Sequence, residues 1–151
     1  MKNIMALLSV FALVSIVSTG PAQAQDKTAD QLIASKKKAD MTYRQLMEIM
    51  GRASTMIHEG IIRENKQMVK TGTQVILNHP APNHKPWSIM AKADQADFKA
   101  TLPSFNKMMD ANAARIETEA GKGNWEEATT ASHELMSVCM SCHSVWRARV
   151  Q

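Results

Sequence analysis

The sequence has little of what sheet proteins and disulfide-rich proteins need. Aromatic residues make up only 5% of the 151 residues, and the chain contains just two cysteines. No stretch alternates apolar and polar residues in the way that a half-buried strand requires. The two cysteines are three positions apart, so a disulfide between them would close a very small loop and stabilise little. A fold rich in strands and a fold held by disulfides are therefore both disfavoured.

Helix-forming residues dominate instead. Alanine, methionine, lysine, glutamate and glutamine are abundant after residue 24, and apolar residues recur at spacings of three and four. This spacing predicts four helices, over about 28–59, 62–77, 95–120 and from the N-cap Asn124 onward. Gly60 is expected to separate the first two, and a proline-rich segment, 79–94, is the one long loop. The pattern predicts an all-α fold, an antiparallel four-helix bundle.

The first 24 residues have the form of a secretory signal peptide. Lys2 supplies a positive start, residues 4–17 are almost continuously apolar, and residues 22–24, Ala-Gln-Ala, form a small-residue cleavage site. The apolar run is too short for a typical membrane span. We therefore expect residues 1–24 to be removed on export, leaving a mature chain, 25–151, that is one domain without a membrane anchor.

The excess of basic residues is small and scattered. The chain has 18 lysines and arginines against 14 acidic residues, a formal net charge of +4. Its single basic run is Lys36-Lys37-Lys38, and a solvated helix face accounts for so short a run better than a nucleic-acid patch does. No nucleic-acid partner is expected.

Both cysteines belong to one short motif, because residues 139–143 read Cys-Met-Ser-Cys-His. This is the attachment signature of a c-type haem. Each thiol adds to one of two vinyl groups on the same porphyrin edge, and the adjacent His143 binds the iron. A thioredoxin-like pair would follow a strand, and a zinc site would need a fourth ligand such as His133. The motif therefore predicts one covalent haem c, held by Cys139 and Cys142.

The predicted fourth helix places this motif on its buried side. Its apolar stripe consists of Trp125, Ala128, Ser132, Leu135, Cys139, Cys142 and Trp146. Since both cysteines lie on the stripe, we expect the haem inside the bundle, between facing helices. Only eight residues follow His143, so a second iron ligand from the protein must come from far upstream.

With these features the chain resembles the cytochrome c′ family, the class II c-type cytochromes. The resemblance covers essentially the whole mature chain: its length, its four helices and a haem motif near the carboxyl end. Trp146 and Arg147 match the aromatic and basic residues that the family tends to carry three and four positions after the histidine. Arg44, Met47 and Gly51 resemble the family's first-helix pattern, although the spacing from Arg44 to Met47 is one residue shorter.

The resemblance implies that the residue at the methionine or leucine position of the first-helix pattern determines the function. In family members with methionine there, the thioether binds iron, and the six-coordinate, low-spin haem suits electron transfer. In members with leucine or another non-ligand, iron stays five-coordinate and high-spin and binds nitric oxide or carbon monoxide. Met47 is the expected ligand, because its distance in sequence to Gly51 matches the family's pattern. Met50 lies one turn later on the same stripe and is the alternative.

Further roles are implied for charged side chains. Arg147 and Arg44 are candidates to pair with the haem propionates, and for both the alternative is a solvated surface arginine. Among the remaining histidines, His79 and His84 are expected to be solvated in the long loop. His58 lies near the first-helix stripe and is a minor candidate for a second iron-binding histidine.

These observations predict a periplasmic monohaem cytochrome that carries single electrons between redox partner proteins and is not an enzyme. The alternative is a five-coordinate haem protein whose partners are small diatomic gases. The resemblance also implies that two copies can pair through their first two helices. Ile61, Ile62 and Met68 are candidates for that face, and the same residues would serve equally as core.

Overall fold

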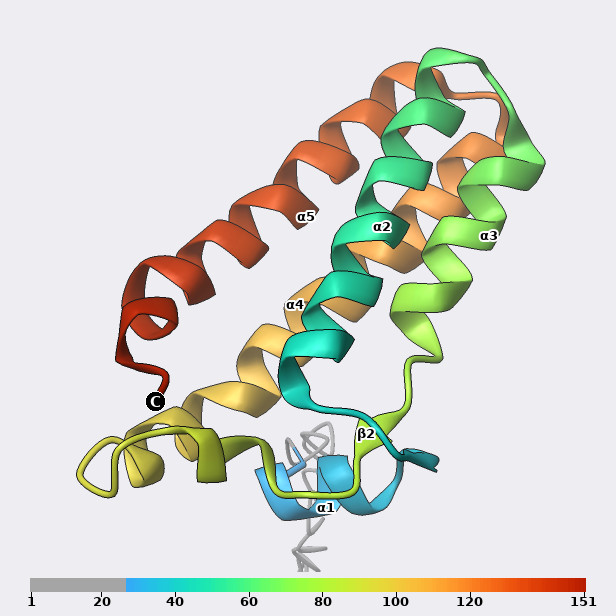
Figure 1. Cartoon of the computed structure of the whole chain (residues 1–151). Coiled ribbons are helices and arrows are strands. Elements are labelled where there is room, and N and C mark those ends of the chain that lie inside the picture. The colour runs from blue at the N-terminus through green and yellow to red at the C-terminus, as the bar shows by residue number, and fades with distance from the viewer. Residues whose placement is uncertain (1–26) are drawn as a thin grey trace, which may run out of the picture.

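The structure, a computed structural model, describes residues 27–151, and the predicted signal peptide, residues 1–24, lies outside them. The expected all-α class is confirmed. Four long helices carry the fold (Figure 1). They are α2 (Tyr43–Ile62), α3 (Lys66–Leu77), α4 (Gln95–Lys122) and α5 (Trp125–Trp146). A short helix, α1 (Ala29–Ala34), precedes them, and a 3-10 turn, η2 (Arg147–Arg149), follows them.

The long helices form two hairpins whose tight turns lie at the same end of the molecule (Figure 1). Helix α2 packs on α3, α3 on α4, α4 on α5, and α5 on α2. A direct contact joins the two turns, because Lys66 Nζ donates to the carbonyl oxygen of Gly121 at 2.9 Å. At the other end the helices are joined by the long loop that the prolines predict.

The expected first helix, 28–59, is wrong in one respect, because the chain divides it into α1 and α2. Each piece begins with a reciprocal capping box, Thr28 with Gln31 and Thr42 with Gln45. In the second box the Thr42 hydroxyl accepts from the Gln45 backbone, and the Gln45 side chain accepts from the Thr42 backbone at 2.7 Å. Capping satisfies the free N–H groups of a new helix, so it fixes a second start. Between them lies the short strand β1 (Lys38–Ala39).

The expected separation of the next two helices at Gly60 is also displaced. Helix α2 continues to Ile62, and the chain turns at Glu64, whose φ of 52° is left-handed, before Asn65 caps α3. Gly60 serves packing instead. A Cβ there would lie 2.8 Å from Val69 Cγ2, so the missing side chain lets α2 and α3 approach closely.

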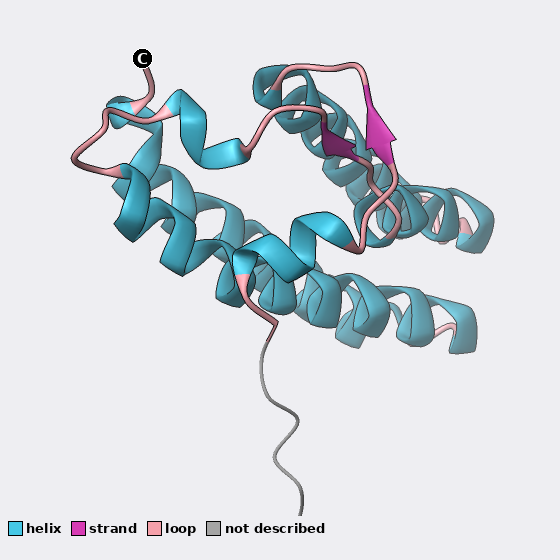
Figure 2. Ribbon diagram, turned by 90° about the horizontal axis from the view of Figure 1, so that it is seen from below, coloured by secondary structure: helices cyan, strands magenta, loops and turns pink. Residues whose placement is uncertain are grey.

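The long loop contains ordered pieces that fold back on the helices (Figure 2). Strand β2 (Ala81–Pro82) pairs in parallel with β1, and the Ala81 N–H donates to the Lys37 carbonyl at 2.8 Å. A 3-10 turn, η1 (Pro86–Ile89), then buries Trp87. Burial of this part of the loop agrees with the apolar residues in its sequence.

The boundaries of the last two helices agree closely with expectation. Helix α4 runs two residues past the predicted end and stops at Gly123, which has a left-handed φ of 81°. Pro103 lies inside α4. Asn124 caps α5, accepting from the Glu127 backbone at 3.4 Å.

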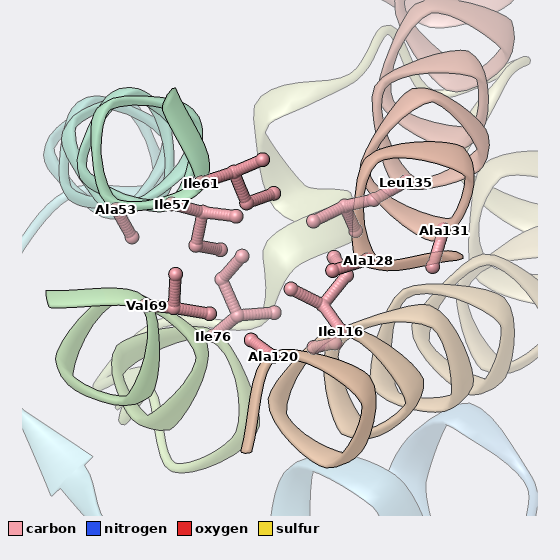
Figure 3. Packing of buried hydrophobic residues seen from close by; sticks show 11 residues of the cluster. Ala53, Ile57, Ile61, Val69, Ile76, Ile116, Ala120, Ala128, Ala131 and Leu135 are labelled. Atoms are coloured by element: carbon pink, nitrogen blue, oxygen red, sulfur yellow. The ribbon is translucent and has the colours of Figure 1, made fainter. Parts of the chain in front are cut away.

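Two apolar clusters hold the fold together. The packed core lies near the helix turns and joins α2, α3, α4 and α5 (Figure 3). It consists of Ala53, Ile57, Ile61, Val69, Ile76, Ala113, Ile116, Ala120, Ala128, Ala131 and Leu135. The aromatic cluster lies at the other end and consists of Ala29, Trp87, Met90, Phe98 and Trp146. Phe98 packs edge-on against both Trp146 and Tyr43.

Ile61 therefore belongs to the core, whereas Ile62 beside it is 83% exposed. Within residues 27–151 no helix combines the length and the apolar character needed to cross a bilayer.

Candidate functional site

A cavity of about 280 Å³ separates the two apolar clusters. Helix α5 forms one wall, and α2 and α4 form others, while α1 and the loop around β2 close the end. In Figure 1 the lower half of α5 diverges from α2 at this level. Most of the lining is aliphatic, aromatic or sulfur-containing, including Leu46, Leu102, Phe105, Met109, Pro82 and Pro86. The cavity therefore suits a large apolar ligand.

The three residues of the haem motif all line this cavity. Cys139, Cys142 and His143 are half-buried on α5, and both cysteines are free thiols. One helical turn separates Cys139 from the other two, so all three side chains share one face of the helix. The sequence prediction that both cysteines face inward is confirmed.

Both candidate methionines line the same cavity from α2. Met50 also packs against the packed core, so it has a structural role of its own. Met47, half-buried one turn nearer the start of α2, is not part of that cluster. The Met47 thioether therefore contributes less to core packing than the Met50 thioether does.

The thiols lack the properties of a redox-active or nucleophilic pair. Burial raises the pKa of Cys139, and burial together with the charge of Cys139 raises the pKa of Cys142. Reactive thiols have lowered pKa values, commonly at a helix N-terminus, whereas these two lie in the last turns of α5. The element directly before α5 is the helix α4, whereas a thioredoxin-like pair would follow a strand.

A four-ligand zinc site finds no support either. His133, the proposed fourth ligand, is exposed and lines a different depression, between α2 and the start of α5. Within residues 27–151, no three side chains of the types that hold zinc gather in a metal-binding arrangement. Zinc needs four ligands that converge, and these do not.

His58 lines the cavity, but both of its ring nitrogens have protein partners. Nδ1 lies 2.9 Å from the carbonyl oxygen of Ser54, which can only accept, so Nδ1 carries the proton. Nε2 then accepts from the hydroxyl of the buried Ser132 at 3.1 Å. These bonds hold His58 between α2 and α5, and they leave no lone pair for iron.

The two predicted propionate partners do not reach the cavity. Arg44 on α2 and Arg147 after α5 are exposed, and neither is among the lining residues. The neighbouring Arg149 instead contributes to the packing of the carboxyl end. It lies over the Trp146 ring and pairs with Asp94 at 3.2 Å.

Two residues of the site escaped sequence analysis. Lys36 lines the cavity and is half-buried, although its basic run reads as a solvated face. His79 lines it too, and the expectation that His79 is solvated is wrong. Pairing of β1 with β2 draws both segments across the end of the cavity. That pairing is a tertiary contact, and no local sequence pattern predicts it.

The chain matches no model of a known protein family, and neither a curated protein nor a solved structure matches it. The site must therefore be interpreted from its own chemistry.

Proposed function

We propose that this chain is an exported class II c-type cytochrome, a relative of cytochrome c′, that carries single electrons between redox partners in the periplasm. One haem c would be attached through Cys139 and Cys142 inside an antiparallel four-helix bundle. The observation that supports this most strongly is the gathering of both thiols, the His143 imidazole and the Met47 thioether around one apolar cavity.

The donor set fits haem better than it fits the other groups considered. Two thiols on one helix face can form both thioether links, and an adjacent imidazole is a common haem-iron ligand. The opposite wall offers a soft thioether, and the rest of the lining is mainly apolar. Haem, when bound, supplies a one-electron iron couple.

The protein side chains then determine which use of that couple is favoured. Methionine opposite histidine raises the reduction potential of haem iron. His58 is engaged by Ser54 and Ser132, so it is not available as an acid–base group of the kind that a peroxidase needs. These contacts favour an electron carrier over a peroxidase.

The mouth of the cavity provides a route for electrons. Met136 and Met140 line the cavity and are 39% and 57% exposed. Val145 nearby on α5 is also exposed. An apolar rim beside the two cysteines is a suitable contact surface for a redox partner protein, because a haem attached there would lie near the surface.

The first test is the mass of the protein after expression with a c-type haem maturation system. Wild type should carry one covalent haem, and the double variant Cys139→Ala, Cys142→Ala should carry none. Wild type without added mass would overturn the proposal.

The second test concerns the sixth ligand. Oxidised wild type should be low-spin, with a methionine-to-iron charge-transfer band, and Met47→Leu should lose the band and bind carbon monoxide. Met50→Leu is the matched control and should keep the band. A wild type that is already high-spin and takes up carbon monoxide rapidly would replace electron transfer with binding of nitric oxide or carbon monoxide.

A further inference from the structure

The wall of the cavity formed by the segments around β1 and β2 carries a small polar group in otherwise apolar surroundings. Lys36 lies between α1 and β1, His79 lies just before β2, and Asn106 lies on α4. Asp110, one turn after Asn106, accepts from the Asn106 amide at 2.6 Å. Three separate segments of the chain therefore bring polar side chains to one place.

This group is incomplete without a ligand. His79 Nδ1 donates to the carbonyl of Pro80 at 3.0 Å, and its buried Nε2 lies near Asn106 without a well-aligned hydrogen bond to any described residue. Asp110 Oδ1 is likewise buried without a partner among the described residues. Lys36 forms no ion pair with any carboxylate of residues 27–151. Asp110 offsets the burial of the Lys36 charge only in part, because the pKa of Lys36 stays lowered. A half-buried cation and an unpartnered ring nitrogen are both costly, and a further anionic group beside them would reduce that cost.

We propose that Lys36 and His79 bind the propionate carboxylates of the haem, an assignment that rests on the proposed function above. In the porphyrin, the propionates lie on the edge opposite the two vinyl-derived thioethers. Attachment to α5 therefore directs the carboxylates away from α5. Figures 1 and 2 show the β1–β2 pair well apart from the carboxyl end of α5, and residues of both regions line the cavity.

The electrostatics of the pair are consistent with an anionic ligand. Burial lowers the pKa of Lys36, against the raising effect of Asp110, and Lys27 lowers it slightly further. Burial also lowers the pKa of His79, with a further contribution from Lys36, and the neighbouring Asn106, Asp110 and the Pro80 carbonyl only partly oppose it. A carboxylate in the cavity would stabilise both charged forms, so both pKa values should rise when haem is attached.

The assignment differs from the one that the family resemblance implies. Arg44 and Arg147 are exposed and do not line the cavity, whereas Lys36 and His79 do. Within the basic run, only Lys36 is half-buried; Lys37 and Lys38 are exposed. The run thus supplies its own control residue.

The test compares Lys36→Met with Lys37→Met in the haem-loaded protein. Methionine keeps an apolar stem and removes the charge. Loss of the cation leaves a propionate charge uncompensated, which favours ferric iron. The ferric-to-ferrous equilibrium should shift about tenfold toward ferric, which corresponds to about 59 mV for a one-electron couple. Lys37→Met should leave the reduction potential unchanged. Lys36→Arg keeps the cation and should retain most of the wild-type potential.

A second readout reports on the carboxylates directly. The propionate bands in the reduced-minus-oxidised infrared spectrum should move in Lys36→Met and in His79→Leu, and stay in place in Lys37→Met. Since Lys36 and His79 lie on different segments, each variant tests the assignment independently.

The outcomes separate this inference from the proposed function. If wild type carries covalent haem but neither Lys36→Met nor His79→Leu alters the potential or the infrared bands, the propionate assignment is wrong and the cytochrome proposal stands. If wild type carries no haem, the proposed function fails, and the assignment fails with it.

Discussion

The pair α2 and α5 is packed at one end and separated by a cavity at the other. At the packed end, Ile57 on α2 and Ala128 and Ala131 on α5 belong to the packed core and are all fully buried. At the open end, the same two helices present Met47 and Cys139 to the cavity. One helix pair thus contributes to both the core and the site.

The difference between the two ends is one of side-chain size and flexibility. Apart from Leu135, the packed end uses alanine and β-branched residues, whose limited rotamers fit one arrangement. No methionine is among the buried members of the packed core, whereas five line the cavity: Met47, Met50, Met109, Met136 and Met140. Unbranched thioethers adapt to an irregular ligand, so they suit a cavity wall better than a core.

The largest expected effect is the loss of a core side chain. Ile57→Ala should reduce the free energy of unfolding by about 2–5 kcal/mol, because Ile57 is fully buried and its removal leaves a void. Met47→Ala should cost much less in the haem-free protein, since Met47 already faces a cavity. Urea denaturation of both variants makes the measurement. Equal costs would mean that the open end is as tightly packed as the core.

A smaller effect is expected where α2 and α3 approach closely. In Gly72→Ala the new Cβ would lie 2.7 Å from Ile57 Cγ1 and 2.9 Å from the Ala53 carbonyl oxygen. Such overpacking should cost about 1–3 kcal/mol. Gly121→Ala is the matched control, because nothing lies within 4 Å of its new methyl group. Thermal denaturation that shows no loss in Gly72→Ala would indicate that the packed end relaxes easily.

A gain in stability is expected on the cavity side of the same helix. Gly51 lies inside α2 with nothing within 4 Å of an added Cβ, so Gly51→Ala should stabilise the haem-free protein by about 0.5–1 kcal/mol. Gly51 lines the cavity, so the gain should shrink if the proposed haem is attached. Denaturation of both forms compares the two gains. An equal gain in each form would place Gly51 outside the haem contact.

The smallest effect is the pH dependence of the free energy of unfolding, and it should arise from His79 at the open end. The pKa of His79 is lowered from 6.5 by burial and by Lys36. The unfolded chain therefore binds the proton more readily, and the stability of the haem-free protein should fall as the pH drops below 6.5. His79→Gln should reduce this loss, whereas His133→Gln, at an exposed position, should not. A pH profile that is unchanged in His79→Gln would contradict the burial of this ring.

The sequence was sufficient to predict the start and the buried face of α5, because both depend on local residues. Asn124 caps the helix, and the stripe that includes Leu135 and Cys139 has regular helical spacing. The division of the first helix was also encoded locally, in the Thr42-to-Gln45 capping box. The apolar stripe has a gap after Leu32 but resumes at Ala39 and Tyr43, so periodicity alone predicted one long helix.

The positions of Lys36 and His79 could not be derived in this way. Each lies in a short segment without periodicity, and each is brought to the cavity by the pairing of β1 with β2. Pairing between residues about 40 positions apart depends on the folded helices around it. Local composition therefore favours solvent exposure for both residues, and the tertiary contact overrides it.

The carboxyl end of the chain has a consequence for the helix that carries the cysteines. After α5, Val150 bridges to Met90, and the Gln151 N–H donates to the Ile89 carbonyl at 3.0 Å. At its other end, α5 is tied to α4 through Arg115, which pairs with Glu127 and Glu134. A helix anchored at both termini resists tilting when the charge of a group attached to it changes. In an electron carrier, such rigidity keeps the reorganisation energy low and the exchange of electrons fast.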